Sequence, residues 1–378
     1  MDKKYWQALA VMVGYTIGVG MFGLPFLISR AGILAFFVFL IILGPAQYLL
    51  HLIYANLIIV TKNYHRLPGY VEIYLGKRGK TIVLLAKIIG NYGALLAYII
   101  ITGIFLEQLL GPYFGGNKLI YASILFFIEA TIIFFGIGMI ARAELFMTAL
   151  LLAIVCIIAF KGWPIINVHN YSLIDWKYFL LPYGAMLFAI DGSGSLPIVA
   201  RLLKRDKKKM KSVVRIGTIL PIIVIILFTI SIIGISGANT TPDALTGVKL
   251  IFSDGIIFFS LIFGILTMIT SFLGVAESMK ETYCWDYKMN KHLSWALAVF
   301  IPYLLYLLGM KNLINVISFS GAIAGGLAGI VLILIFSKLK KLNKLTLFKY
   351  KPGAFIIYFL ISLFVAGIAY EIYYFLIK

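Results

Sequence analysis

Two glycine-rich segments of the sequence have the composition to expose backbone groups to a small polar ligand. They read TIGVGMFGLPF at 16–26 and AIDGSGSLPIV at 189–199. Proline lacks a backbone donor and glycine favours irregular backbone, so each segment predicts a break within a helix. In the first break the N–H groups of Gly18, Val19 and Gly20, beside the positive end of the following half-helix, are candidates to bind a carboxylate. Thr16 is assigned to the same site.

The second break offers the complementary chemistry. Its carbonyl groups at Phe188, Ala189 and Ile190 are candidates to accept hydrogen bonds from an ammonium group. Asp191 follows directly, and an acid deep in a membrane is costly unless it is paired or solvated. Three roles for Asp191 stay open, namely pairing with a substrate ammonium, carrying a coupling proton, and capping the next half-helix. Tyr98, in another segment, is a candidate gate over the ligand.

The composition identifies the elements that must position these residues. Of the 378 residues, 62% are hydrophobic and 12% are charged, whereas soluble domains carry about 25% charged residues. The chain is therefore expected to be an all-α integral membrane protein, with eleven apolar segments long enough to cross a bilayer. These predicted spans are 6–29, 32–60, 81–110, 118–138, 143–162, 178–201, 212–236, 254–279, 294–310, 313–337 and 353–377.

The positive charge alternates between the connections. Twenty-five Lys and Arg residues fall in the N-terminal segment and in every second connection after it, against seven in the others. This asymmetry predicts a plasma-membrane protein with a cytoplasmic N-terminus and an extracytoplasmic C-terminus. The net charge of +19 then indicates cytoplasmic loops such as RLLKRDKKKMKSVVR, and not a nucleic-acid partner. Lys87, near one end of the third span, is expected to reach towards the membrane surface.

The two breaks also indicate an internal repeat. Their Leu-Pro pairs lie 172 residues apart, and five spans separate corresponding positions, so the two segments cross in opposite directions. This pattern predicts one domain over 1–378, made of inverted repeats at 5–162 and 178–337 and an eleventh helix at 353–377. Broken helices at matching positions of inverted repeats indicate a substrate site near the membrane midplane.

At this point the sequence resembles a known family. GVGMFGLPFLISRAG is similar to the first-helix signature of the amino acid/auxin permeases. LFAIDGSGSLPIVARLLKRDKKKMKSVVRIG resembles their sixth helix and basic loop, and ISFSGAIAGGLAGIVLILIFSKLK the small-residue pattern of their tenth. The related bacterial aromatic amino acid permeases share this architecture and stay open as an alternative. The short N-terminal segment favours a prokaryotic member.

The resemblance implies the leucine-transporter-like five-plus-five fold of the amino acid–polyamine–organocation superfamily, and transport of amino acids coupled to protons or sodium. Superfamily members often hold a cation between the first and eighth spans. Thr267, Thr270 and Ser271 are the matching candidates here, although such hydroxyl groups also serve as contacts between helices. Proton coupling through Asp191 is the other hypothesis. No further cofactor and no metal centre are expected.

The expected function is secondary active import of an amino acid. The sequence contains no GxxxxGK[ST] motif for ATP-driven pumping, no HExxH motif and no evident catalytic constellation, so an enzyme is not expected. The apolar residues of the breaks favour a neutral substrate, and large or aromatic amino acids are among the candidates. An exchanger, or a channel-like or sensor protein of the same fold, is the alternative. The expected partners are the amino acid and the lipid bilayer, and the oligomeric state stays open.

Overall fold

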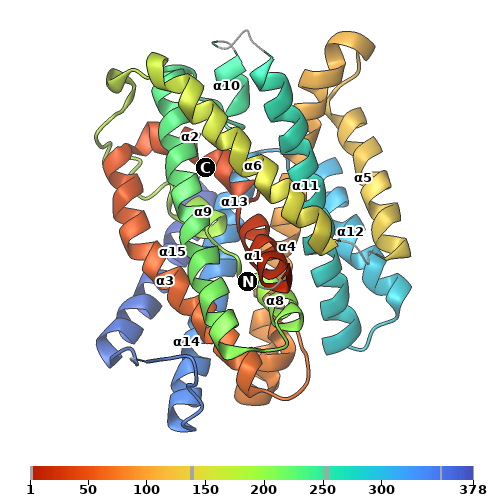
Figure 1. The fold of residues 1–378 in the computed structure, drawn as a ribbon, viewed down its shortest axis with the longest axis vertical. Coiled ribbons are helices and arrows are strands. Elements are labelled where there is room, and N and C mark those ends of the chain that lie inside the picture. The colour runs from red at the N-terminus through yellow and green to blue at the C-terminus, as the bar shows by residue number, and fades with distance from the viewer. Residues whose placement is uncertain (1–2, 137–139, 250, 252–254, 350, 378) are drawn as a thin grey trace.

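The structure is a computed structural model that describes residues 3–136, 140–249, 251, 255–349 and 351–377. Helices account for its regular secondary structure, and these residues form no β-strand. Most of the long helices run roughly along the vertical axis of Figure 1 and pack side by side into one bundle. The predicted all-α class is therefore confirmed.

The helices follow the predicted order along the chain. The first half contains α1 (Lys3–Thr16), α2 (Gly20–Ala31), α3 (Ile33–Val60), α4 (Leu67–Phe114), α5 (Lys118–Phe135) and α6 (Ile140–Gly162). The second half contains α7 (Tyr183–Ala189), α8 (Leu196–Leu202), α9 (Lys207–Ser236), α10 (Leu245–Lys249), α11 (Ile256–Glu281), α12 (Lys291–Leu307), α13 (Leu313–Ser320), α14 (Gly326–Lys341) and α15 (Ala354–Ile377). The 3₁₀ helix η3 (Ser193–Ser195) precedes α8, and the π-helical turn η6 (Gly321–Gly325) joins α13 to α14.

The number of spans depends on how the shorter helices are counted. By length and composition, nine helices within the described residues can cross a membrane, and α1 with α2, bent by 44° at their junction, makes ten. The remaining predicted span corresponds to α12, which is apolar but has only 17 residues. The protein is thus a multi-pass membrane protein, and the count of eleven stays a prediction.

The largest difference from the predicted boundaries is in the third span. It was expected at 81–110, but α4 covers 48 residues, from Leu67 to Phe114. The helix starts early because Pro68 stands in its first turn, where the missing N–H costs nothing. Gly76, with φ of 73°, bends it without the penalty that a side chain would impose. The basic residues after Gly76 therefore lie on a helix and not in a loop.

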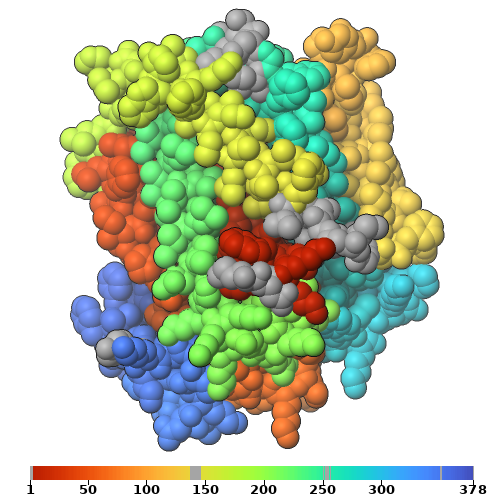
Figure 2. All heavy atoms as spheres, viewed as in Figure 1, coloured from red at the N-terminus to blue at the C-terminus, as the bar shows by residue number. Residues whose placement is uncertain are grey.

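The packing surrounds the N-terminal helix with later parts of the chain. α1 lies between α6 and α9, and its red surface is visible between yellow and green atoms in Figure 2. α4 and α11 pack along each other. In Figure 1 the α8–α9 connection and the α14–α15 connection lie at the lower end, and the α4–α5 connection lies at the upper end. The two basic connections thus share one end of the bundle, as their alternation predicts.

Candidate functional site

The first break separates α1 from α2 and exposes backbone donors. α1 ends at Thr16 and α2 begins at Gly20. Between them, the N–H of Gly18 donates to the carbonyl of Thr16 at 2.9 Å. Within the described residues, the N–H groups of Val19 and Gly20 have no hydrogen-bond acceptor, and no side chain caps α2. The start of α2 therefore presents free donors and the positive end of a helix dipole.

Glycine allows the two breaks to approach each other. A Cβ atom on Gly20 would lie 2.8 Å from Cα of Ala189 and 2.9 Å from Cδ1 of Phe188, which no side chain tolerates. A Cβ on Gly18 would lie 3.0 Å from the hydroxyl oxygen of Tyr98. Gly20 is thus required by its contact with the second break, whereas a side chain at Gly18 would need Tyr98 of α4 to shift.

The second break covers the residues between α7 and η3. The carbonyl of Phe188 accepts a hydrogen bond from the N–H of Asp191 at 3.3 Å, so it is already engaged. The carbonyls of Ala189 and Ile190 accept no hydrogen bond from the described residues. Two of the three carbonyl groups assigned to an ammonium are therefore available, and the third closes the end of α7.

Asp191 lies at the centre of the second break. Its Oδ1 accepts hydrogen bonds from Nε2 of Gln47 at 2.8 Å and from the N–H of Ser193 at 2.9 Å. Nε2 of His51 lies 3.6 Å from the same oxygen. About 39% of the side-chain surface of Asp191 remains open, towards a cavity. The carboxylate therefore supports the turn that leads into η3 and also faces solvent-accessible space.

Gln47 and His51 stand one helical turn apart on α3, beside Asp191, and the sequence did not assign them to the candidate site. Both are buried, and His51 has no exposed surface. Nε2 of His51 accepts a hydrogen bond from the N–H of Gly192 at 3.0 Å. Two polar residues at i and i+4 within a very apolar helix were the available signal.

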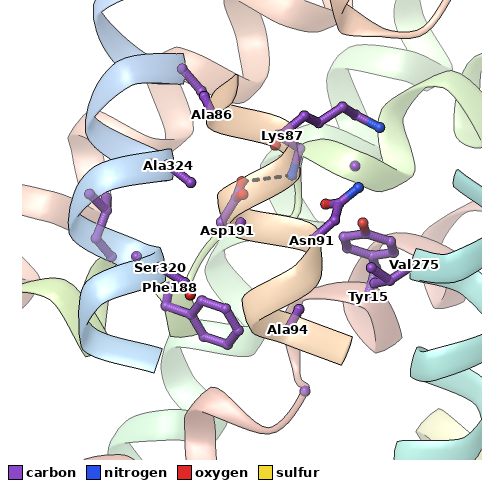
Figure 3. A pocket seen from close by; sticks show the side chains of 18 of the residues that line it. Tyr15, Ala86, Lys87, Asn91, Ala94, Phe188, Asp191, Val275, Ser320 and Ala324 are labelled. Carbon is purple, nitrogen blue, oxygen red and sulfur yellow. Dashed lines mark hydrogen bonds between the residues drawn. The ribbon is translucent and has the colours of Figure 1, made fainter. Parts of the chain in front are cut away.

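A cavity lies between the two breaks and is bordered by α4, α11 and the π-helical turn η6. It has about 110 Å³ of room for the centres of water molecules, several times the roughly 10–15 Å³ that one water needs. Figure 3 shows Asp191, Phe188 and Tyr15 around it. The predicted site residues on its wall are Thr16, Gly18, Gly20, Tyr98, Phe188 and Asp191. Val19, Ala189 and Ile190 are buried and are not part of this wall.

The predicted cation ligands lie apart from this cavity. Thr267, Thr270 and Ser271 are on α11, whose contribution to the cavity wall is Val275, one turn further on. The hydroxyl of Thr270 donates to the carbonyl of Thr267 at 3.0 Å. The hydroxyl of Ser271 is buried and has no hydrogen-bond partner within the described residues. The three hydroxyl groups share a helix, but they are not gathered with the candidate ligand groups of the breaks.

Lys87 lines the cavity and does not reach the membrane surface as expected. Its ammonium group donates to the hydroxyl groups of Ser278 and Thr282, both at 3.0 Å. These hydroxyl groups stand on the facing helix and its π-helical extension, within reach of a lysine that stays inside the bundle. The interior therefore holds a lysine beside the cavity that hydropathy alone assigned to the helix end.

Arg66 connects the second break to α11. It lies in the connection before α4, as expected, but its side chain is buried. Its guanidinium group is buried, binds the carboxylate of Glu281, and donates to the carbonyl of Gly194 at 3.2 Å. Arg201 of α8 binds the same carboxylate at 3.1 Å. The residue stands just before α4, and only the folding of α4 against α11 brings it inside.

Comparison with known proteins agrees with this architecture. The sequence profile of the tryptophan/tyrosine permease family matches residues 1–371. The tyrosine-specific transport system 1 of Haemophilus influenzae is 26% identical over 338 residues, covering 82% of this chain and 81% of that protein. Glutamine transporter 2 of Aliivibrio fischeri is 21% identical over 341 residues, covering 85% and 86%. The crystal structure of MhsT in complex with L-phenylalanine matches with a TM-score of 0.71 at 16% identity, covering 98% of both chains.

The likeness to MhsT confirms the predicted leucine-transporter-like fold with its first and sixth helices broken. The profile match corresponds to the second of the two resemblances, the aromatic amino acid permeases, and not to the amino acid/auxin permeases. The matched family and the relatives are transporters, in agreement with the expectation that the chain is not an enzyme.

Proposed function

Because this chain belongs to the tryptophan/tyrosine permease family, we propose that it imports an amino acid across the plasma membrane by ion-coupled alternating access. One observation carries the proposal. A cavity lies where two broken helices meet, with uncapped N–H groups from one break and a carboxylate from the other on or beside its wall. Broken helices that meet at such a cavity are the expected binding arrangement of this class of transporter.

The two breaks can recognise the two charges of an amino acid separately. The N–H groups of Val19 and Gly20, at the positive end of α2, would receive the carboxylate. Asp191, with the carbonyls of Ala189 and Ile190, would receive the ammonium group. Each charge would then exchange its water for fixed protein dipoles, which reduces the cost of burying it.

The walls of the cavity favour a neutral side chain of considerable size. Phe188, Leu187 and Ala94 supply apolar surface, and aromatic or aliphatic walls favour neutral ligands. The ammonium group of Lys87 on the same wall would repel a cationic side chain. The substrates named for two relatives, tyrosine and glutamine, and the phenylalanine bound to MhsT support a neutral, large or aromatic amino acid.

The orientation and the superfamily are parts of the same proposal. The charge asymmetry supports a cytoplasmic N-terminus and, with eleven spans, an extracytoplasmic C-terminus. The cavity wall includes Lys87 and also Arg66, which belongs to the same basic connection as Lys62. This connection is expected on the cytoplasmic side, so the cavity would lead towards the cytoplasm. The fold supports membership of the amino acid–polyamine–organocation superfamily.

We favour protons over sodium as the coupling ion. Asp191 is the titratable carboxylate on the cavity wall, whereas the hydroxyl groups of Thr267, Thr270 and Ser271 lie off it. A proton taken up through Asp191 would act on the same break that contacts the substrate. Sodium at the three hydroxyl groups is the competing hypothesis.

Transport into proteoliposomes tests this function. Uptake of labelled tyrosine, tryptophan, phenylalanine and glutamine would be measured under an inward proton gradient, an inward sodium gradient, and neither. We expect concentrative uptake of an aromatic amino acid under the proton gradient alone. Concentrative uptake under sodium alone would contradict proton coupling, and counterflow without concentration under either gradient would identify an exchanger. Neither uptake nor counterflow of any amino acid would contradict transport and favour a sensor of the same fold.

A further inference from the structure

His51, in the interior of the protein, connects its own helix α3 to the second break and to α9. It stands on α3, has no exposed surface, and uses both ring nitrogens. Nε2 lies 3.0 Å from the N–H of Gly192 in the break, and Nδ1 lies 2.9 Å from the hydroxyl oxygen of Thr218 on α9. Such complete use of a buried imidazole indicates a defined protonation state.

The hydrogen-bond partners determine that state. The hydroxyl of Thr218 donates its single proton to the carbonyl of Val214 at 2.8 Å, so towards His51 its oxygen can only accept. Nδ1 must therefore carry a proton. The N–H of Gly192 is a donor, so Nε2 must present its lone pair. The imidazole is consequently neutral, with Nδ1–H fixed by Thr218 and Nε2 supporting the backbone of the break.

Asp191 lies close enough to Nε2 of His51 to form an ion pair with it once that nitrogen is protonated. Its Oδ1 lies 3.6 Å from Nε2 of His51, and Nε2 of Gln47 lies 2.8 Å from Oδ1 and 3.3 Å from Nε2 of His51. Gln47 thereby positions the two groups beside each other. Asp191 is open to the cavity and His51 is not, so the carboxylate is the route between solvent and the ring.

Other titratable groups face the same cavity as the break, among them Tyr54 of α3 and Lys87 of α4. From α1, the hydroxyl of Tyr15 lies against Gly194. The guanidinium group of Arg66, which precedes α4, donates to the carbonyl of Gly194. The contact from α9 is the hydroxyl of Thr218, which does not titrate. Asp191 is the carboxylate at ion-pair distance from the imidazole within the described residues.

We propose that His51 is the proton-binding residue of the transport cycle, and that protonation exchanges its hydrogen bond to Gly192 for an ion pair with Asp191. This inference rests on the proposed function, because it names the residue that binds the coupled proton. A proton enters through Asp191 and binds Nε2 of His51. After the change of access it leaves through Asp191 to the other side of the membrane. No covalent bond other than N–H or O–H forms or breaks.

The exchange links the proton to the shape of the binding site. A protonated Nε2 is a donor, so it can no longer accept from the N–H of Gly192, and the backbone of the break must find another arrangement. The same backbone carries Asp191, Ser193 and Gly194 on the cavity wall. Proton and substrate would thus bias one segment between two conformations, and each would alter the affinity for the other.

The test compares two transport modes in proteoliposomes for the wild type and His51→Gln. Glutamine can still accept the hydrogen bond from Gly192, but it cannot bind the proton. We expect the variant to lose accumulation driven by a proton gradient, its concentration ratio falling to unity, while measurable counterflow persists at equal pH on both sides. His169→Gln, in an exposed segment, is the matched control and should accumulate substrate as the wild type does.

Wild-type accumulation by His51→Gln under a proton gradient would overturn the inference. Absence of counterflow in the wild type would instead overturn the proposed function, so the two failures are distinguishable. Thr218→Val keeps His51 but removes the hydroxyl oxygen that accepts from Nδ1–H. That oxygen stabilises the imidazolium more than the neutral ring, so its loss disfavours protonation of His51. The substitution should move the midpoint of the pH profile of uptake to lower pH. An unchanged profile in a well-folded Thr218→Val protein would also overturn the inference, even if His51→Gln fails to fold.

Discussion

The two breaks occupy corresponding positions in the chain but are built differently. The first, between α1 and α2, consists of glycine and apolar residues and presents backbone N–H groups without a capping side chain. The second, between α7 and η3, contains a carboxylate held by side chains of α3, with a guanidinium group on the carbonyl of Gly194. One break thus depends on close approach, and the other on a polar network.

This difference indicates a division of labour. An uncapped helix start attracts an anion at a fixed place and has no group that titrates. A carboxylate beside an imidazole can bind a cation and can also exchange a proton. We therefore expect substitutions in the first break to affect binding geometry, and those in the second to affect charge recognition, coupling and rate.

The largest effect is expected at the contact between the breaks. Gly20→Ala would place a methyl group within 2.9 Å of Ala189 and Phe188, so the two segments must separate. We expect initial uptake to fall on the order of 100-fold, as for other small misplacements of a reacting or binding group. The matched control is Gly274→Ala on α11, where a Cβ meets no atom within 4 Å. Equal uptake by both variants would show that the breaks need not touch.

Removal of the charge from the second break should have the next largest effect. Asp191→Asn retains an acceptor for Gln47 and Ser193 but loses its pairing with an ammonium group, so KM should rise about 10- to 100-fold. Asp206→Asn is the control, because Asp206 caps the first turn of α9 through Lys209 and asparagine caps equally well. Unchanged KM in Asp191→Asn would contradict pairing of Asp191 with the substrate ammonium group.

A smaller effect is expected where the second break is held by Arg66. Arg66→Gln loses the hydrogen bond to Gly194, and kcat should fall about three- to tenfold while KM changes little. Arg201→Gln removes the other cation from the same carboxylate but does not touch the break. The kcat of both variants would be measured at saturating substrate. If Arg201→Gln slows transport as much as Arg66→Gln, the contact with Gly194 has no special role.

The smallest effect is expected at the hydroxyl groups on α11. Ser271→Ala removes a buried hydroxyl without a partner in the described residues, so proton-driven uptake should change by less than about twofold. Uptake would be measured with and without sodium. Loss of a sodium-dependent component in this variant alone would favour the competing cation site and would make the first break and α11 the coupling region.

The sequence predicted the breaks better than their surroundings. Gly20 and Asp191 lie in marked glycine–proline segments, and both prove to lie on the cavity wall. His51 and Arg66 carry no local motif, since one is a polar residue in an apolar helix and the other a basic residue before a proline. Their partners are 141 and 215 positions away in the chain, and no local pattern indicates such pairings.

Composition and periodicity by themselves determined the class of this protein. Long apolar segments must form helices in a bilayer, because backbone groups there have no water to bind. Clustered glycines permit the irregular backbone of the two breaks. The tertiary structure decided which side chains complete the breaks. A buried polar group takes whichever partner the packing of helices brings within hydrogen-bond distance, and for Asp191 that packing brought Gln47 and His51 from α3.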